Sequence, residues 1–298
     1  MLQQIKTRVR DASYFIGNAV LPSDIRNSGP LGSLRRQVIF WSRESFVMSY
    51  PKCGRTWLRT MIGRVVELHH GLSIRNPMEV QHFWKLSAGI PCIAFSHDDG
   101  PNLKPASAIE TDKSRYAAKN ILFLTRDPRD VLVSYYFDAK NRMNVFDGTL
   151  SDFVYQDIGS IDSIIKFYNI WANNRSRVKS FQLLSYEEMH QDPKAALRTA
   201  IEFLGIRGVP DDVIDNAIEF GSFSNLRKIE AANAFDHERM RPRDHANPES
   251  FKVRRGKISG YKDYLAPAEI EYIDAKIRDH LDPFYANYRT AGAQAVSA

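Results

Sequence analysis

Short apolar runs alternate along this chain with longer segments whose apolar residues recur at helical spacing. Four runs have the length and composition of buried strands: 46–48, 90–95, 120–125 and 180–185. Six segments show the spacing of amphipathic helices: 57–68, 128–143, 161–178, 194–204, 211–220 and 266–281. Strands that alternate with helices predict an α/β fold, with a central parallel β-sheet covered by helices on both faces.

The two ends of the chain stand apart from this pattern. A turn-rich stretch (LPSDIRNSGPLGS) separates an N-terminal arm, 1–40, from the single α/β domain expected over 41–288. In the arm, Leu2, Ile5, Val9 and Ile16 recur at near-helical spacing among basic residues. This pattern fits a short helix docked on the core, or an amphipathic helix that lies on a membrane surface or grips a partner. The Ala-rich tail, 289–298, is expected to be disordered.

Composition narrows the cellular setting. Two cysteines in 298 residues cannot form a disulfide framework, and no apolar run approaches the roughly 18 residues that span a bilayer. The N-terminus lacks the apolar core of a signal peptide. These features predict a cytoplasmic protein.

The positive charge is concentrated late in the chain. The net charge is +6, and the segment from Arg227 to Lys262 holds ten Lys or Arg against five Asp or Glu. A local basic excess indicates a local anionic partner, such as a phosphate-rich small molecule, a nucleic acid or a lipid headgroup.

The first candidate site is the turn Tyr50-Pro51-Lys52-Cys53-Gly54-Arg55-Thr56-Trp57, where a strand leads into a helix. Backbone N–H groups at a helix N-terminus bind phosphate, and Lys52 and Thr56 add a charge and a hydroxyl. The GxxxxGK[ST] phosphate-loop pattern is absent. A P-loop-like phosphate site and a helix cap with an incidental lysine both fit this segment.

Two further segments carry candidate anion-binding residues. Arg126 ends the strand 120–125, and Ser134 lies about two helical turns further on. Both side chains can face one anionic group, although an Arg126–Asp130 ion pair that braces the turn is equally consistent with the sequence. Later, Arg254 and Arg255 precede a glycine in a loop, which fits either a phosphate clamp or a solvated basic loop.

These three segments occur in the order YPKxGxTW, then RxPxDxxxSYY about seventy residues later, then RxG near the end. In that order the chain resembles the sulfotransferases that use 3′-phosphoadenosine 5′-phosphosulfate (PAPS), in particular the cytosolic group, and we expect a bacterial-type member. The resemblance runs from about Ser45 to Tyr264. It implies transfer of a sulfonate group to an acceptor hydroxyl, or less favourably an amine, with 3′-phosphoadenosine 5′-phosphate (PAP) as the product and without a metal or a nucleic-acid partner.

The resemblance also implies roles for the first loop. Lys52 contacts the 5′-phosphosulfate and neutralises the leaving oxygen, and Trp57 packs against the adenine. The remaining cradle residues are Cys53, Gly54, Arg55 and Thr56. Where the family usually reads Lys-Ser-Gly-Thr-Thr, this chain has Cys53 in place of the serine and Arg55 in place of the first threonine. Cys53 is interpreted as a small packing residue rather than a nucleophile.

Other donor contacts follow from the later motifs. The resemblance assigns the 3′-phosphate to Arg126 and Ser134. Further donor contacts are carried over to Arg254, Arg255, Gly256, Tyr186 and Phe223. Tyr186 matches an adenine-contacting tyrosine, and the match of Phe223 is looser because Gly221 replaces a threonine.

The acceptor must lose a proton, and the histidine that serves as base in cytosolic relatives corresponds to His97. An ordinary loop histidine bonded by Asp98 or Asp99 is the alternative, and those carboxylates could also orient the ring. The family lysine two residues earlier is Phe95 here, which leaves open how the sulfonate oxygens are neutralised.

Two other functions fit parts of the pattern. One is a nucleotide-dependent kinase built on a P-loop, and the other is a non-catalytic protein that binds PAP or PAPS at a membrane surface. The acceptor class stays open between a lipid, a glycan and a small molecule. Aromatic residues in variable loops are candidates for lining its pocket: Phe83, Trp84, Tyr155 and Phe235. The oligomeric state is not readable from the sequence.

Overall fold

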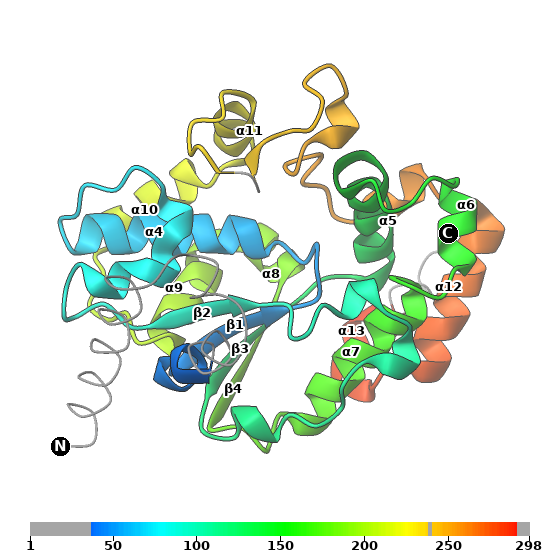
Figure 1. The fold of residues 1–298 in the computed structure, drawn as a ribbon, viewed down its shortest axis with the longest axis horizontal. Helices are drawn as coiled ribbons and strands as arrows, with labels where there is room; N and C mark the ends of the chain where they lie inside the picture. Colours follow the sequence, from blue (N-terminus) through cyan, green and yellow to red (C-terminus); the bar gives the residue numbers. More distant parts are fainter. Residues whose placement is uncertain (1–36, 238–239, 291–298) are drawn as a thin grey trace, which may run out of the picture.

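The computed structural model describes residues 37–237 and 240–290, and its centre is a sheet of four parallel strands (Figure 1). The strands, in the order β2-β1-β3-β4, are β1 (Ser45–Ser49), β2 (Ile93–Ser96), β3 (Asn120–Thr125) and β4 (Ser180–Ser185). The predicted α/β fold with a parallel sheet is confirmed. Most of the N-terminal arm and tail lies outside the described residues, and the domain boundaries stay a prediction.

Burial explains the apolar runs. The central strands β1 and β3 are covered on both faces, so nearly every residue in them is buried and their sequences read as continuous apolar runs. The edge strands β2 and β4 are only partly buried. Parallel pairing sets Met48 beside Ser96 and Thr125 beside Ser185. The carboxyl ends of the strands therefore share one edge of the sheet, where ligands of such folds bind.

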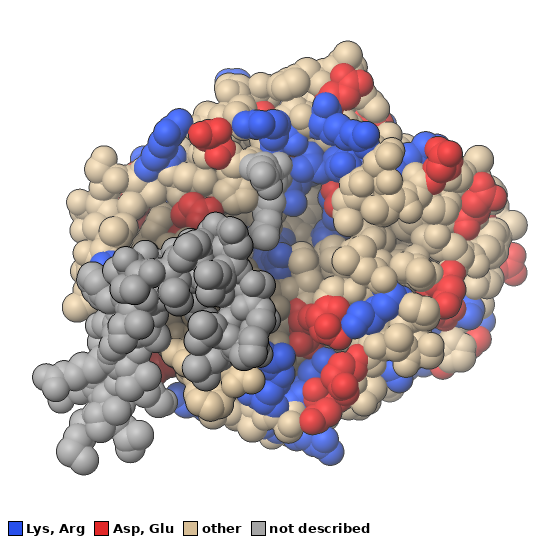
Figure 2. Space-filling view, in the orientation of Figure 1, with Lys and Arg blue, Asp and Glu red and all other residues tan. Residues whose placement is uncertain are grey.

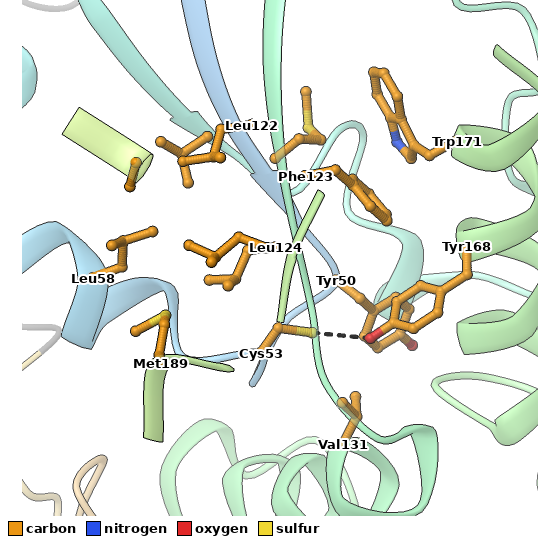
Figure 3. Close-up of a cluster of buried hydrophobic side chains, with 14 of the residues drawn as sticks. Tyr50, Cys53, Leu58, Leu122, Phe123, Leu124, Val131, Tyr168, Trp171 and Met189 are labelled. Atoms are coloured by element: carbon orange, nitrogen blue, oxygen red, sulfur yellow. Dashed lines mark hydrogen bonds between the residues drawn. The ribbon is translucent and has the colours of Figure 1, made fainter. Parts of the chain in front are cut away.

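Helices cover both faces of the sheet, as Figure 1 shows. On one side lie α4 (Arg55–His69), α9 (Pro193–Phe203) and α10 (Asp211–Phe220). On the other lie α7 (Ile161–Asn174), α12 (Pro267–His280) and α13 (Ala286–Thr290). Large buried side chains fill the space between the layers, among them Leu58, Phe123 and Trp171 (Figure 3). This packing holds the strand ends in fixed positions.

The remaining elements surround the carboxyl edge. They are α5 (Pro128–Asp138), a π-helical turn (Ala139–Met143), α6 (Leu150–Tyr155), α8 (Tyr186–Gln191) and α11 (Phe223–Ala231). Short 3₁₀ segments occur at Pro77–Lys85, Pro101–Leu103, Ala106–Ala108, Ser114–Tyr116, Pro248–Ser250, Gly260–Asp263 and Pro283–Tyr285. Within 37–237 and 240–290, no helix is long and apolar enough to cross a membrane.

Three predicted elements differ in detail. The helix expected over 161–178 ends at Asn174, and the strand expected from residue 90 begins at Ile93. The helix expected over 128–143 is continuous, but its last turn widens from α to π geometry. The short helices α6, α8 and α11 were not predicted, because six to nine residues are too few to show a clear apolar period.

Candidate functional site

The first loop leaves the carboxyl end of β1 through two left-handed residues. Lys52 has φ +74° and Gly54 has φ +86°, and Gly54 is the N-cap of α4. A Cβ atom on Gly54 would lie 2.6 Å from Cδ2 of Tyr186, so only glycine fits without a rearrangement. The glycine therefore lets the ring of Tyr186, the first residue of α8, approach the helix N-terminus.

Arg126, at the carboxyl end of β3, connects the predicted motifs. Its Nη1 donates to the carbonyl oxygen of Lys52 (3.3 Å) and its Nη2 to that of Lys257 (3.0 Å). The guanidinium also pairs with Asp130 at 3.4 Å and lies over the ring of Tyr186, 4.2 Å from its centroid. The Arg126–Asp130 ion pair thus exists, and it is one part of a larger junction. Nε of Arg126 is buried, and within 37–237 and 240–290 it has no hydrogen-bond partner.

The late loop is docked onto the start of α5. Asp130 accepts hydrogen bonds from the backbone N–H groups of Ser259 and Tyr261, both at 2.9 Å. Ser134 follows one turn after Asp130 on the same helix and is half-buried. These bonds bring the second and third motifs, more than 120 positions apart in the sequence, into one site.

The two arginines of the late loop are paired within it. Arg254 donates to Glu249 (2.9 Å), and its guanidinium lies 4.1 Å from the ring centroid of Phe137 on α5. Arg255 forms an exposed ion pair with Asp263 at 2.9 Å. The interpretation of a purely solvated basic loop is wrong for Arg254, because its side chain is 14% exposed.

Gly256 and Phe223 lie together at the edge of this loop. Gly256 has φ +61°, and a Cβ atom there would be 2.8 Å from Cδ2 of Phe223. Phe223 begins α11 and is 46% exposed. Trp57 packs edge-on against Tyr186, with ring centroids 5.7 Å apart. Aromatic faces from three different elements therefore lie beside the first loop and the late loop.

His97 follows the carboxyl end of β2, beside the first loop. Its Nδ1 lies 2.9 Å from the carbonyl oxygen of Ser49, the last residue of β1. Because a carbonyl oxygen only accepts, Nδ1 carries the hydrogen and the lone pair of the ring belongs to Nε2. The carboxylate of Asp98 instead bonds Tyr116 and Lys113, each at 2.8 Å. A backbone carbonyl, rather than that carboxylate, orients the imidazole.

Comparison with known proteins identifies the family of the chain. Residues 42–284 match the sulfotransferase domain family. The chain belongs to the sulfotransferase family. The predicted enzyme class is therefore confirmed, and the family match favours sulfonate transfer over the kinase alternative.

The matched relatives of this sulfotransferase are distant. Cytosolic sulfotransferase 17 of Arabidopsis thaliana is 24% identical over 83% of this chain and 78% of its own length. The 3-beta-hydroxysteroid sulfotransferase of Cavia porcellus is 26% identical over 82% and 85%. These relatives, from a plant and a mammal, give no support to the expected bacterial type.

Solved structures share the fold. Mouse sulfotransferase SULT7A1 complexed with PAP superposes with a TM-score of 0.58 at 22% identity, over 85% of this chain and 88% of that one. Retinol dehydratase, in complex with androsterone and PAP, gives a TM-score of 0.56 at 17% identity, over 82% and 83%.

The sulfotransferase site contains an ion pair that the sequence analysis missed. Lys52 Nζ donates to Oδ1 of Asp138 at 2.9 Å, and the two side chains are 12% and 15% exposed. Arg142, in the π-helical turn, pairs with the same oxygen at 3.1 Å. Burial would raise the pKa of Asp138, but Lys52, Lys252 and Arg142 outweigh it and lower that pKa to about 2. In the sequence, the signal that could have indicated Asp138 was its position one helical turn after Ser134.

Cys53 lies on the core side of the first loop (Figure 3). Its Sγ is 3.3 Å from the hydroxyl oxygen of Tyr168, a residue of α7. Burial raises the pKa of the Cys53 thiol to about 12 despite that hydrogen bond. A thiol with this pKa is protonated at neutral pH and does not act as a nucleophile.

A fully buried carboxylate, Glu230 on α11, organises the late segment and was also missed. It accepts hydrogen bonds from the backbone N–H of Lys252 (2.6 Å) and Val253 (2.8 Å), and from Nη1 of Arg142 (3.3 Å). In Figure 2, basic side chains gather in the hollow between the α11 side and the α5 side of this face. Of the basic excess seen in the sequence, Arg254 packs against Phe137 on α5, and Glu230 holds the backbone of Lys252.

The candidate acceptor-side aromatics are divided among different environments. Phe83 joins the main core, and Phe235 packs with Met78 in a small separate cluster. Tyr155 is exposed and packs against Tyr272, on α12. These side chains do not form one shared group in the described residues.

Proposed function

We propose that this sulfotransferase moves the sulfonate group of PAPS to an acceptor hydroxyl and releases PAP. One observation carries the proposal: the first loop, Arg126 and His97 converge at the carboxyl ends of three adjacent strands. The match to the sulfotransferase domain supports the reaction, and the PAP complexes of two fold neighbours support the donor.

The site fits a nucleotide with several phosphates. Gly54 leaves the N-terminal N–H groups of α4 without a side-chain cap, so the backbone of Cys53, Gly54, Arg55 and Thr56 is suited to hold the 5′-phosphosulfate. Nε of Arg126 is buried and has no partner in the part of the chain that the structure describes, which supports an anion at the second motif, where Arg126 and Ser134 would hold the 3′-phosphate.

The remaining donor contacts come from aromatic faces and the late loop. Trp57 and Tyr186 would contact the adenine, and Phe223 would lie beside it. Arg254, Arg255 and the backbone at Gly256 would close the late loop over the nucleotide. The packing of Phe223 against Gly256 supports this set, because it links the two segments.

His97 and Lys52 divide the chemistry of transfer. Nε2 of His97 takes the proton of the acceptor hydroxyl while the oxygen forms its bond to sulfur. The ammonium of Lys52 neutralises the charge that collects on the phosphate oxygen as the sulfur–oxygen bond to phosphate breaks. The bond from Nδ1 to Ser49 keeps the required tautomer throughout.

A hydroxyl is the proposed acceptor group. Two matched relatives are named for such acceptors, a flavonol 3-sulfotransferase and a 3-beta-hydroxysteroid sulfotransferase. Lipid, glycan and small-molecule acceptors all carry this group. A cytoplasmic location and membrane contact through the arm 1–40 are further proposals, and residues 1–36 of that arm lie outside the described structure.

The first test is calorimetric titration with PAP. We expect micromolar binding by the wild type and a loss of about 10- to 100-fold in Arg126→Ala, because a charge-assisted contact to phosphate is removed. Folded wild-type protein that binds no PAP would remove the proposal.

The second test separates catalysis from binding. His97→Asn should keep PAP affinity within about twofold and lower turnover by about 100-fold or more, because the base is lost. The assay follows PAP release from PAPS with a panel of hydroxyl acceptors. Tight PAP binding by the wild type without turnover on any of them would instead favour the non-catalytic alternative.

A further inference from the structure

Four basic side chains meet beside the first loop of the site. Lys252 lies within electrostatic range of Lys52, Arg142 and Arg55, and Asp138 lies within range of Lys252, Lys52 and Arg142. The backbone N–H of Lys252 and Nη1 of Arg142 also bind the same oxygen of Glu230. The four basic side chains come from the first loop, the start of α4, the π-helical turn and the late segment. Among the described residues, Asp138 is the one acidic side chain that contributes strongly to the electrostatic surroundings of Lys252.

The acidic side chains in this cluster are already engaged. Asp138 holds Lys52 at 2.9 Å and Arg142 at 3.1 Å through the same oxygen. Glu230 uses one oxygen on Arg142 and the backbone of Lys252, and the other on the backbone of Val253. Among the described residues, Nζ of Lys252 has no hydrogen-bond partner.

The position of Lys252 is fixed by its backbone. Glu230 is fully buried and binds the N–H groups of both Lys252 and the next residue, Val253. The segment cannot carry this lysine away from the cluster without breaking those two bonds. In a half-buried, positively charged place, an amine stays fully charged at neutral pH only when an anion lies beside it.

We propose that Lys252 is a further catalytic residue of sulfonate transfer, whose ammonium binds the sulfonate oxygens beside Lys52. The inference rests on the proposed function. In the transfer, the acceptor oxygen bonds to sulfur, the sulfur–oxygen bond to the 5′-phosphate breaks, and the acceptor proton goes to His97. Lys252 neither gains nor loses a proton in that step. Its ammonium stabilises the negative charge on the sulfonate oxygens while the sulfonate group passes from the 5′-phosphate to the acceptor oxygen.

This role of Lys252 compensates for a difference from the family that the sequence shows. At the end of β2, Phe95 stands where the family resemblance leads one to expect a lysine, and its ring packs under the guanidinium of Arg59 at 5.1 Å. The strand therefore supplies no ammonium two residues before His97. Lys252 supplies one from the late segment, on the side of the cluster that holds Lys52.

The electrostatics of the cluster agree with an anion site. Burial, then repulsion by Lys52, Arg142 and Arg55, lowers the pKa of Lys252 to about 7, and Asp138 opposes the shift. An anion placed beside the amine would favour its charged form and raise that pKa again. Above pH 7, binding of the sulfonate should therefore take up a proton.

The experiment compares PAPS with PAP, which lacks the sulfonate, on Lys252→Met. We expect PAPS affinity to fall by about 10-fold or more and PAP affinity to stay within about twofold, because the lost contact is to the sulfonate. Lys262→Met, which removes an exposed lysine of the same segment, should leave both affinities unchanged. Lys252→Arg should restore most of the PAPS affinity.

Each outcome decides a different question. An equal change for PAP and PAPS in Lys252→Met, or no change for either, would overturn the role of Lys252 while leaving the proposed function intact. Failure of the wild type to bind either nucleotide would overturn both. Calorimetry at pH 8 in two buffers of different ionisation enthalpy supplies a readout independent of activity. Wild type should take up a proton with PAPS, and Lys252→Met should not.

Discussion

The two halves of the site are held in place by different forces. The strand-end half consists of 45–57, 93–97 and 120–134, and the late segment comprises 223–263. Ladder hydrogen bonds and a continuous apolar core fix the strand-end half. The late segment shares a small cluster of buried apolar side chains with Met78 of the 3₁₀ segment Pro77–Lys85, and it depends on the buried carboxylates of Asp130 and Glu230. Single polar substitutions should therefore disturb the late segment most.

The largest effect is expected at Glu230. Glu230→Gln removes a buried charge that serves Arg142 and two backbone N–H groups, and should lower the free energy of unfolding by about 3 kcal/mol. Hydrogen exchange should speed up across 249–256 and stay slow in β1 and β3. The exposed Glu202→Gln is the matched control, expected within about 0.5 kcal/mol of wild type. Equal behaviour of the two variants in urea denaturation would contradict the comparison.

A steric change comes next, in the strand-end half. Gly54→Ala forces a left-handed residue to carry a Cβ and pushes it against Tyr186, at a cost of about 2–3 kcal/mol in the free energy of unfolding. PAP affinity should fall as well, because the loop backbone must move. Gly205→Ala has a similar positive φ with nothing within 4 Å of the new Cβ, so it separates backbone strain from the clash. If the two variants are equally stable, the close approach of Tyr186 is not what requires glycine.

The sequence predicted the strand-end half better than the late segment. Strands β3 and β4 were predicted at their observed ends, because apolar runs between helices leave few alternatives. The order of the motifs along the chain indicated the first loop and Arg126, and the family resemblance implied His97. Asp138 and Glu230 were missed, because a carboxylate reads as solvent-exposed until the fold shows which cations and N–H groups surround it. Their function depends on contacts between distant segments, which a local pattern does not contain.

A smaller effect is expected where the halves meet, at Asp138. Its pKa is lowered from 3.8 to about 2, so the ionised carboxylate contributes roughly 2 kcal/mol of stability above pH 4. That contribution is lost as the pH falls through 4 toward 2. Asp138→Asn should be less stable than wild type by about this amount at pH 7, and the gap should close near pH 2. A gap that is constant from pH 7 to pH 2 would show that the ion pair with Lys52 contributes nothing.

The smallest effect concerns Cys53. With a pKa of about 12, roughly one thiol in ten thousand is ionised at pH 8, and the side chain is fully buried. Native protein should therefore resist iodoacetamide at Cys53, and urea should make it reactive. Mass spectrometry of the labelled peptide measures this. Rapid labelling of the native protein would mean that the first loop opens more readily than its packing implies.

The hydroxyl of Tyr168 has a consequence for protein engineering. It accepts a hydrogen bond from the N–H of Arg126 (3.0 Å), donates to the carbonyl of the same residue (2.9 Å) and contacts Cys53 (3.3 Å). One phenol on α7 thus holds the spacing between the first loop and the start of the second motif, which come from other elements. If those loops were transplanted onto another parallel sheet, their sequences would be transferred without Tyr168, the residue that sets the distance between them. The smallest portable unit of this site is therefore discontinuous in the gene, because it includes Tyr168 of α7.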